Sequence, residues 1–431
     1  MKIAIAGYGA EGEANYNYWS ANSANEVTIV DESSTPTRPL PDGAKTILAP
    51  GAFNQLDDFD LVIRTAGLNP AKIKTNGKIW SATNEFFSKC SAPIIGVTGT
   101  KGKGTTASLI AAILSAANKK VWLVGNIGKV ALPLLDDISP TDIVVFELSS
   151  FQLWDLEKSP HVAVITPVEP DHLNVHENME DYVSAKVNIS RHQTSDDICF
   201  YQPVSQFTKR IATANPNRPA RRYGVADDGA VYVQDGFFKI NNRTICSVDA
   251  LRLIGEHNIE NACAAISVAT YLNIDNESIE RGLRSFEGLP HRLEFVREYE
   301  GVAYYNDSFS SAPSASIAAI RAFSRPEIII LGGSDKGADF TLLTAALKEK
   351  QNIKQVIVVG EMRQKLAALL SEAGVSFIIC DARTMPEIVD RARQSAVAGD
   401  VIILSPGCAS LDMFRDFYDR GDQFKKYVAS L

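Results

Sequence analysis

The chain alternates, almost from end to end, between short runs of β-branched residues and segments with apolar residues at helical spacing. Strands that alternate with helices form parallel sheets, because a parallel pair needs a crossover and the crossover is usually a helix. The strand-like runs include KIAIAG at residues 2–7, PIIGVTG at 93–99 and PEIIILGG at 326–333. The pattern therefore predicts an α/β fold built from several doubly wound parallel sheets.

The grouping of these runs along the 431 residues predicts three domains of ordinary size. We place a Rossmann-like domain at residues 1–89, a P-loop-type parallel sheet at 90–287 and a second Rossmann-like domain at 288–431. The joins follow the rhythm of strands and helices, since no segment rich in proline or serine marks a linker.

Composition and charge restrict the classes of partner. Apolar residues make up 45% of the chain, which is enough for real cores, and the formal net charge is −8. A negative net charge argues against a nucleic-acid partner or an anionic membrane surface. No stretch approaches the roughly 18 apolar residues of a membrane span, and the N-terminus lacks the apolar run of a signal peptide. The six cysteines are scattered without a C-x-x-C pair, so we expect reduced thiols in a cytoplasmic protein.

Residues 96–110, GVTGTKGKGTTASLI, nearly match a phosphate-binding loop between a strand and a helix. In the usual motif the lysine is followed directly by serine or threonine, whose hydroxyl binds Mg²⁺. Here Gly104 follows Lys103, and the hydroxyls arrive at Thr105 and Thr106. Backbone N–H groups at the start of the helix would bind phosphates, and Lys103 would add positive charge. A glycine-rich turn without a ligand is the alternative interpretation of this degenerate match.

A carboxylate further along the chain favours the nucleotide interpretation, and a histidine and a lysine follow it. Glu147 ends the apolar run DIVVFE, where its carboxylate would supply a hard oxygen ligand for Mg²⁺. His172 follows the strand-like VAVITPV, and Lys186 lies within a helical pattern. Taken singly, such a histidine or lysine is more often a structural residue than a catalytic one.

The N-terminal stretch AGYGAEG has the glycine spacing of a dinucleotide-binding turn. Gly7, Gly9 and Gly12 follow the first strand, and Asp31 ends the next one. NAD binding by a dehydrogenase is one interpretation of this pattern. Binding of the diphosphate of a UDP sugar is the other, and we favour it because the ATP-type loop leaves no hydride transfer to explain.

Together, these stretches resemble the Mur ligase family, cytoplasmic ATP-dependent amide ligases of peptidoglycan precursor synthesis. The matching stretches run in the same order through all three predicted domains: GTKGKGTT, GNIG, ELSSFQL, PDHL, SAKVNI, GEHNIENA, GLPHRLE, YNDS, LGGSDKGADF and SPGCASLDMF. Three of them, ELSSFQL, GGSDKGADF and SPGCASLDMF, are most similar to the branch that adds D-glutamate to UDP-N-acetylmuramoyl-L-alanine.

The resemblance implies an ADP-forming ligase. ATP phosphorylates the terminal carboxylate of the UDP-linked substrate, and the amine of glutamate attacks the resulting acyl phosphate. It implies ATP and Mg²⁺ at two sites as cofactors, UDP-N-acetylmuramoyl-L-alanine and glutamate as small-molecule partners, and a monomer. The three predicted domains then bind, in order, the UDP substrate, ATP, and glutamate with part of the nucleotide.

Residue roles follow from the same resemblance. Lys103, His172 and Lys186 are implied as catalytic, and Lys186 as a lysine that CO₂ converts to a carbamate. The implied metal ligands are Thr105, Glu147, His172 and carbamylated Lys186. The implied ATP-binding residues are Gly99, Thr100, Lys101, Gly102, Lys103, Gly104, Thr105, Thr106, Asn258, Asn261, Arg292 and Asp307. The implied substrate-binding residues are Gly7, Gly9, Gly12, Asp31, Gly67, Asn126, Ser149, Lys336, Ser410 and Phe417.

Several positions depart from the family pattern. Gly104 makes the loop similar to that of folylpolyglutamate synthases, and Phe309 stands where the glutamate-adding branch commonly has a lysine. Ser311 replaces a threonine, and RTAGLNP replaces the usual Ser-Pro-Gly of the uridine loop. We hypothesise that Lys101 restores positive charge near the phosphates. L-glutamate or another acidic acceptor, a folylpolyglutamate-type ligase and a non-enzymatic sensor of UDP-muramoyl precursors remain alternatives.

Overall fold

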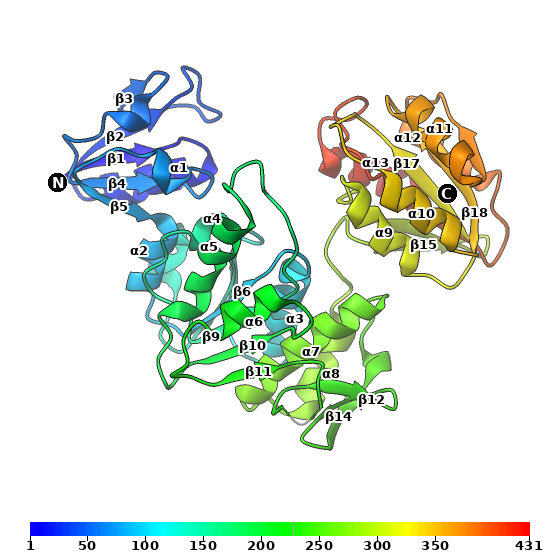
Figure 1. The fold of residues 1–431 in the computed structure, drawn as a ribbon, viewed down its shortest axis with the longest axis horizontal. Coiled ribbons are helices and arrows are strands. Elements are labelled where there is room, and N and C mark those ends of the chain that lie inside the picture. Colours follow the sequence, from blue (N-terminus) through cyan, green and yellow to red (C-terminus); the bar gives the residue numbers. More distant parts are fainter. Residues whose placement is uncertain (227) are drawn as a thin grey trace. The chain divides into compact units, whose positions relative to one another are not determined.

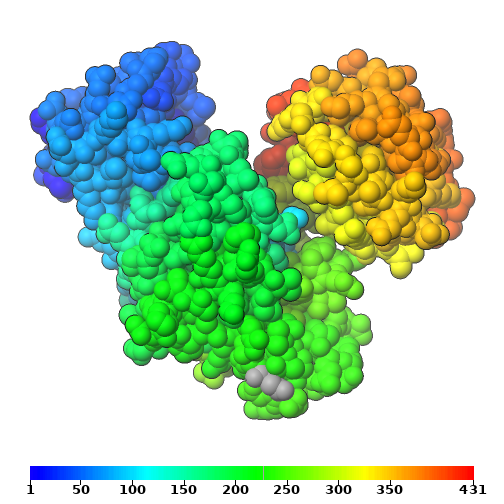
Figure 2. Space-filling model, in the orientation of Figure 1, coloured from blue at the N-terminus to red at the C-terminus, as the bar shows by residue number. Residues whose placement is uncertain are grey.

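A computed structural model describes residues 1–226 and 228–431, and its fold is mixed α/β with parallel sheets, as predicted (Figure 1). The space-filling view shows that side chains fill the space between helices and strands within each part of the chain (Figure 2). The described residues divide into two compact units. The units are residues 1–251 with 259–286, and residues 252–258 with 287–431.

The first unit begins with a five-stranded parallel sheet in the order β3-β2-β1-β4-β5. This is the order of the first five strands of a Rossmann sheet, in which ligands bind at the carboxyl ends of the strands where the order reverses. Helix α1 (Ala10–Ser20) follows β1 directly, and α2 (Ala82–Lys89) follows the last strand. The strands are β1 (Lys2–Ala6), β2 (Glu26–Asp31), β3 (Lys45–Leu48), β4 (Leu61–Arg64) and β5 (Lys78–Ser81).

A six-stranded parallel sheet follows, in the order β11-β10-β9-β6-β8-β7. Strand β6 lies between β8 and β9, so the loops that leave the carboxyl ends of these three strands meet at one edge of the sheet. The strands are β6 (Ile94–Thr98), β7 (Val121–Gly125), β8 (Ile143–Glu147), β9 (Val162–Ile165), β10 (Ile198–Tyr201) and β11 (Ala220–Arg222).

The helices of this part surround the sheet. Helices α3 and α8 pack so closely that a Cβ on Gly282 would lie 2.4 Å from the Cα of Ile113. The helices are α3 (Lys103–Ala116), α4 (Ser150–Leu153), α5 (Met179–Arg191), α6 (Gln206–Ala212), α7 (Glu256–Tyr271) and α8 (Asn276–Ser285).

A small antiparallel sheet of β12 (Tyr232–Gln234), β13 (Phe237–Ile240) and β14 (Arg243–Ser247) also belongs to the first unit. The sequence-based prediction did not include it. Its two turns carry the residues that tight hairpins require, because all four turn residues have positive φ. Those residues are Asp235, Gly236, Asn241 and Asn242.

The second unit contains a six-stranded sheet in the order β15-β16-β20-β17-β18-β19. All strands are parallel except β15, which pairs antiparallel with β16 and was not predicted. The strands are β15 (Glu294–Tyr299), β16 (Val302–Asn306), β17 (Glu327–Gly332), β18 (Ile353–Val359), β19 (Phe377–Ile379) and β20 (Val401–Leu404). The helices are α9 (Pro313–Arg321), α10 (Thr341–Glu349), α11 (Arg363–Ala373), α12 (Met385–Arg393) and α13 (Phe417–Ser430).

Two further expectations concern the whole chain. Among the described residues, no helix combines the length and the apolar character that crossing a membrane requires. All six cysteines are free thiols, as predicted, and five of them are buried. The domain boundaries drawn from the sequence stay predictions.

Candidate active site

The stretch GTKGKGTT forms a strand–loop–helix turn between β6 and α3. Gly99 has a φ of 153°, and a Cβ there would lie 2.0 Å from the hydroxyl oxygen of Thr166. Gly102 caps α3 with a φ of 82°, and a Cβ there would lie 2.4 Å from Asn261 Oδ1. Glycine is required at both positions, because a side chain would be strained in conformation and would collide with these neighbours. The loop is therefore a specific structure rather than an incidental turn.

Residues after Gly102 form the first turn of α3. Lys103 Nζ donates hydrogen bonds to the carbonyl oxygens of Gly99 (3.1 Å) and Thr100 (2.9 Å), so the ammonium lies over the loop. Thr106 is buried and donates to Asn261 Oδ1 at 3.2 Å. This contact ties Thr106 to α7, and the assignment of Mg²⁺ to the Thr105 hydroxyl stays a prediction.

Glu147 lies at the carboxyl end of β8, in register with Val97 on the neighbouring β6. Its side chain is buried, and Asn126 Nδ2 donates to its Oε1 at 3.1 Å. The donor set of Thr105 and Glu147 fits Mg²⁺, which takes oxygen ligands and completes its shell with phosphate oxygens and water. No group of three or more His, Cys, Asp or Glu side chains with metal-binding geometry occurs within residues 1–226 and 228–431.

The side chain of Lys186 extends from α5 to the phosphate loop. The side chain is 1% exposed, and its Nζ donates to the Gly99 carbonyl oxygen at 2.8 Å. The ammonium also lies 4.6 Å from the ring centroid of Tyr182. Burial, and then the neighbouring Lys103 ammonium, hold the pKa of Lys186 well below its ordinary range.

His172 lies on the segment that follows β9, and this segment is attached to the phosphate loop. Thr100 donates through its hydroxyl to the Glu169 carbonyl oxygen at 2.9 Å. The His172 side chain is about half exposed, and its ring lies 4.9 Å from that of Phe151. Lys101 pairs with the Glu169 carboxylate at 2.7 Å, so in this structure its charge is matched by a neighbouring acid.

A cavity of about 350 Å³ lies within the first unit. It brings together three of the predicted substrate-binding residues, Gly67, Asn126 and Ser149. Glu11 and Phe151, which the sequence did not single out, also line it. Glu11 lies inside the AGYGAEG stretch, so its position in the motif was the available signal. Burial raises the pKa of the Glu11 carboxyl, although the Ala66 N–H donates to its Oε2 at 2.8 Å.

The N-terminal glycines allow the backbone to approach closely. A Cβ on Gly7 would lie 2.4 Å from the Thr65 hydroxyl oxygen, and one on Gly12 would lie 2.3 Å from the Gly7 carbonyl oxygen. Gly9 is the N-cap of α1. The carboxylate of Asp31 accepts a hydrogen bond from the Tyr8 N–H at 2.7 Å, so it holds the glycine turn in place.

Three of the remaining residues predicted to bind the nucleotide, Asn258, Arg292 and Asp307, lie in the second unit. Burial raises the pKa of Asp307 to about 6, and this carboxyl accepts from the Ser405 hydroxyl (2.7 Å) and the Leu293 N–H (3.1 Å). The guanidinium carbon of Arg292 lies 4.6 Å from the ring centroid of Phe309. Asn258 donates through Nδ2 to the Ile254 carbonyl oxygen at 2.7 Å, whereas Asn261 belongs to the first unit.

The predicted glutamate pocket also belongs to the second unit. Lys336 is exposed on the loop after β17, and Ser410 is buried on the loop after β20. The two loops are joined, because the Ser334 N–H donates to the Ala409 carbonyl oxygen at 2.9 Å. Phe417 begins α13, and its ring lies 5.2 Å from that of Phe309. The position expected to hold a lysine therefore carries part of an aromatic cluster.

Two family models match the chain: the Mur ligase middle domain over residues 97–269, and the Mur ligase glutamate ligase domain over residues 291–408. These segments span more than half of the chain, and they contain the phosphate loop, Glu147, Lys186 and the loop after β17 of the second unit. The chain belongs to the Mur ligase family.

A relative of nearly the same length indicates the branch of the family that this chain resembles. The chain is 35% identical over 444 residues to a protein of Clostridium kluyveri named UDP-N-acetylmuramoylalanine–D-glutamate ligase. The match covers 99% of this chain and 96% of that relative. It agrees with the branch of the family that the sequence motifs indicated.

Solved structures show the same fold. The UDP-N-acetylmuramate-alanine ligase MurC of Thermotoga maritima matches with a TM-score of 0.63 at 19% identity, over 100% of both chains. The MurF ligase of the same organism, solved in complex with ADP, matches with a TM-score of 0.60 at 17% identity. That match covers 100% of this chain and 95% of the MurF chain.

Proposed function

We propose that this protein joins D-glutamate to UDP-N-acetylmuramoyl-L-alanine with conversion of ATP to ADP and phosphate. The observation that carries the proposal is the gathering of the phosphate loop, Glu147 and Lys186 at one edge of the central sheet, with Asn126 of the substrate cavity bonded directly to Glu147. The near full-length relatives with the corresponding name support it.

The chemistry follows from these groups. A carboxylate does not react with an amine, because oxide is a very poor leaving group. Transfer of the γ-phosphoryl group to a carboxylate oxygen of the substrate gives an acyl phosphate. The amine nitrogen of glutamate then attacks the carbonyl carbon, phosphate leaves, and the nitrogen loses a proton. Mg²⁺ would neutralise phosphate charge, and Thr105 and Glu147 would hold it, while Lys103 binds the phosphate oxygens.

We propose that Lys186 is carbamylated in the working enzyme. Its lowered pKa supports this, since the neutral amine is the form that attacks CO₂. The new C–N bond forms as the nitrogen loses a proton, and the side chain becomes an anion. That anion and His172 would serve as ligands of a second Mg²⁺.

The second unit would supply the groups for glutamate and part of the nucleotide. Lys336 and Ser410 would bind the glutamate carboxylates, Phe417 would form a wall of the pocket, and Arg292 with Asp307 would contact the nucleotide. We further propose a cytoplasmic monomer that takes part in cell-wall biogenesis.

Turnover assays separate this proposal from its alternatives. The protein is supplied with ATP, Mg²⁺ and UDP-N-acetylmuramoyl-L-alanine, with D-glutamate, L-glutamate or no acceptor, and phosphate release and product mass are followed. We expect the ligated product with D-glutamate. Absence of turnover with either enantiomer, together with binding of the UDP substrate, would instead support a sensor.

A folylpolyglutamate-type ligase is the second candidate, because Gly104 gives the loop the glycine pattern of those enzymes. The same assay with dihydrofolate or tetrahydrofolate and L-glutamate tests it. Activity on a folate in place of the UDP substrate would favour this candidate over the first.

A further inference from the structure

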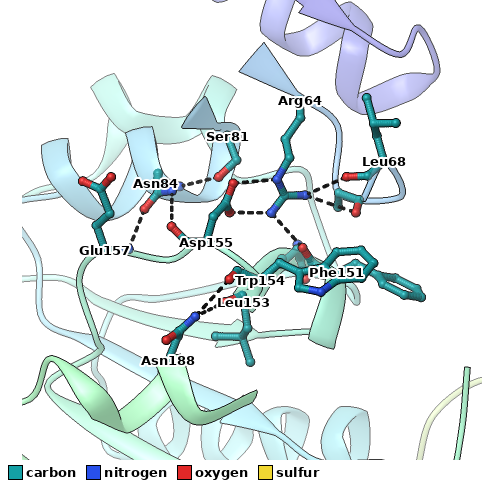
Figure 3. A network of polar contacts seen from close by, with 12 residues as sticks. Arg64, Leu68, Ser81, Asn84, Phe151, Leu153, Trp154, Asp155, Glu157 and Asn188 are labelled. Carbon is teal, nitrogen blue, oxygen red and sulfur yellow. Dashed lines mark hydrogen bonds and ion pairs between the residues drawn. The ribbon is translucent and has the colours of Figure 1, made fainter. Parts of the chain in front are cut away.

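Arg64 is a fully buried arginine at the carboxyl end of β4, with 0% of its surface exposed. It forms a two-pronged ion pair with Asp155, which lies just after α4 (Figure 3). Nε donates to Asp155 Oδ2 at 2.6 Å, and Nη2 donates to Asp155 Oδ1. Nη2 also donates to the carbonyl oxygen of Phe151 at 2.9 Å. The Arg64 guanidinium, at the end of a strand of the five-stranded sheet, thus contacts the α4 region beside the six-stranded parallel sheet. The two contacts are to the Asp155 carboxylate and to the Phe151 carbonyl oxygen.

The other side of the same guanidinium contacts the loop that follows β4. Nη1 lies 3.3 Å from the Ala66 carbonyl oxygen and 3.4 Å from that of Leu68. Ala66, Gly67 and Phe151 all line the 350 Å³ cavity. Arg64 therefore lies behind two walls of this cavity and contacts the backbone of both.

Neighbouring contacts hold each wall in place. Asn84 of α2 donates through Nδ2 to the Asp155 carbonyl oxygen at 2.9 Å, and its Oδ1 accepts from the Glu157 N–H at 2.9 Å (Figure 3). On the opposite wall, Glu11 accepts from the Ala66 N–H. The ion pair is thus the centre of a continuous network that joins α1, α2, β4 and α4.

A buried ion pair is weak evidence for stability alone, because apolar residues of similar volume often serve as well. Its specific value is geometric, since the planar guanidinium fork fixes both the distance and the angle of its partners. We propose that Arg64 is a positioning residue for the UDP-linked substrate: it holds the 65–68 loop and α4 at a fixed separation, so that the cavity is formed before the substrate binds. This inference rests on the proposed function.

The test compares Arg64→Lys with the wild type. Lysine keeps the charge but cannot reproduce the fork or the additional carbonyl contacts. We expect the KM for UDP-N-acetylmuramoyl-L-alanine to rise about tenfold, because the cavity would no longer be held in the shape that binds this substrate. The KM values for ATP and D-glutamate, and kcat at saturating UDP substrate, should stay within about twofold of the wild type.

Arg210→Lys is the matched control, because Arg210 forms a similar two-pronged pair with Glu180 on an exposed surface of the same unit. It should leave all three KM values unchanged. Asp155→Asn provides a second variant in case Arg64→Lys does not fold, and it should raise the same KM. If the double variant of Arg64→Lys and Asp155→Asn folds, its effect should be smaller than the product of the two single effects.

The outcomes separate the two proposals. A wild-type protein without ligase activity would refute the proposed function. An active wild type whose Arg64→Lys and Asp155→Asn variants keep the KM for the UDP substrate would overturn the positioning role alone. Equal losses for all three substrates, or a fall in kcat without a rise in that KM, would also overturn it.

Discussion

At the scale of single residues, the side-chain nitrogens of two lysines lie close to one carbonyl oxygen of the phosphate loop. Lys103 and Lys186 lie 3.1 Å and 2.8 Å from the Gly99 oxygen. Burial of Lys186 disfavours its charged form, and the nearby Lys103 charge disfavours it further. The amine of Lys186 is therefore costly to charge, and the proposed conversion to a carbamate would replace this unfavourable cation with an anion.

We expect Lys186→Ala to lower kcat by about 100-fold or more, because an anionic metal ligand would be lost. Acetate or another short-chain carboxylate should restore part of the activity by occupying the space of the carbamate. Phosphate release with and without added carboxylate measures both effects. Lys209→Ala, at an exposed position of α6, is the control and should behave as the wild type. Full activity of the Lys186→Ala protein would make this lysine purely structural.

The two threonines of the loop offer a second prediction. Thr105→Val should raise the Mg²⁺ concentration needed for half-maximal turnover about tenfold, because one oxygen ligand would be lost; a tenfold change corresponds to about 1.4 kcal/mol. Thr106→Val removes the hydrogen bond to Asn261 and should instead lower stability by about 1 kcal/mol. Mg²⁺ titration of turnover and thermal unfolding of both variants distinguish the roles. Equal Mg²⁺ dependence in the two variants would contradict the assignment of the metal to Thr105.

The sequence identified residues of the site that stand in motifs, such as Lys103 and Glu147. It did not single out Glu11 or Arg64, because their importance depends on which segments fold against them. Arg64 reads as an ordinary strand residue in DLVIRTAG, and its partner Asp155 is 91 positions away. A pairing at that distance has no local signal, so only the folded arrangement shows it.

At the scale of elements, several of the predicted strands are buried on both faces. Such strands read as continuous apolar runs, and β1, β6, β17 and β20 are of this kind. Strand β3 was not predicted because it is an edge strand whose residues are largely exposed. Strand β15 is also an edge strand, and it pairs antiparallel with its only neighbour. Neither β3 (KTIL) nor β15 (EFVREY) has the continuous apolar run by which the buried strands were recognised.

Strand β17 begins with a buried acid that the proposed reaction does not use. Glu327 is 0% exposed, and its Oε1 lies 3.7 Å from Lys350 Nζ and 3.0 Å from Asn352 Nδ2. Burial raises its pKa from 4.5 to about 8. A carboxyl whose pKa is raised by folding adds most to the free energy of unfolding at pH values below its pKa in the unfolded chain. This contribution is lost as the pH rises toward its pKa in the folded protein.

We therefore expect the free energy of unfolding of the wild type to fall between about pH 5 and pH 8, by up to a few kcal/mol from this group. Glu327→Gln keeps the shape and the hydrogen-bonding atoms but does not ionise, so its stability should depend less on pH over this range. Urea unfolding at several pH values measures the difference. Exposed Glu349→Gln is the control. A variant with the same pH dependence as the wild type would show that Glu327 is ionised throughout.

At the scale of the whole molecule, the predicted functions divide between the two compact units. The phosphate loop, Glu147 and the cavity proposed for the UDP substrate belong to the first, and the predicted glutamate-binding residues to the second. The proposed reaction also has two halves, formation of the acyl phosphate and attack by the amine. A change confined to the glutamate residues should therefore affect the second half and spare the first.

Lys336→Ala tests this division, because Lys336 is exposed and belongs to the second unit. Without its charge, the glutamate carboxylates lose a charged hydrogen bond worth about 1.5–3 kcal/mol, so the KM for D-glutamate should rise roughly 10-fold to 100-fold. Reversible formation of the acyl phosphate needs no glutamate, and positional isotope exchange in labelled ATP, with the UDP substrate alone, reports it. This exchange should match the wild type. If the variant loses isotope exchange as well, Lys336 acts on the phosphoryl transfer, and the proposed division between the units fails.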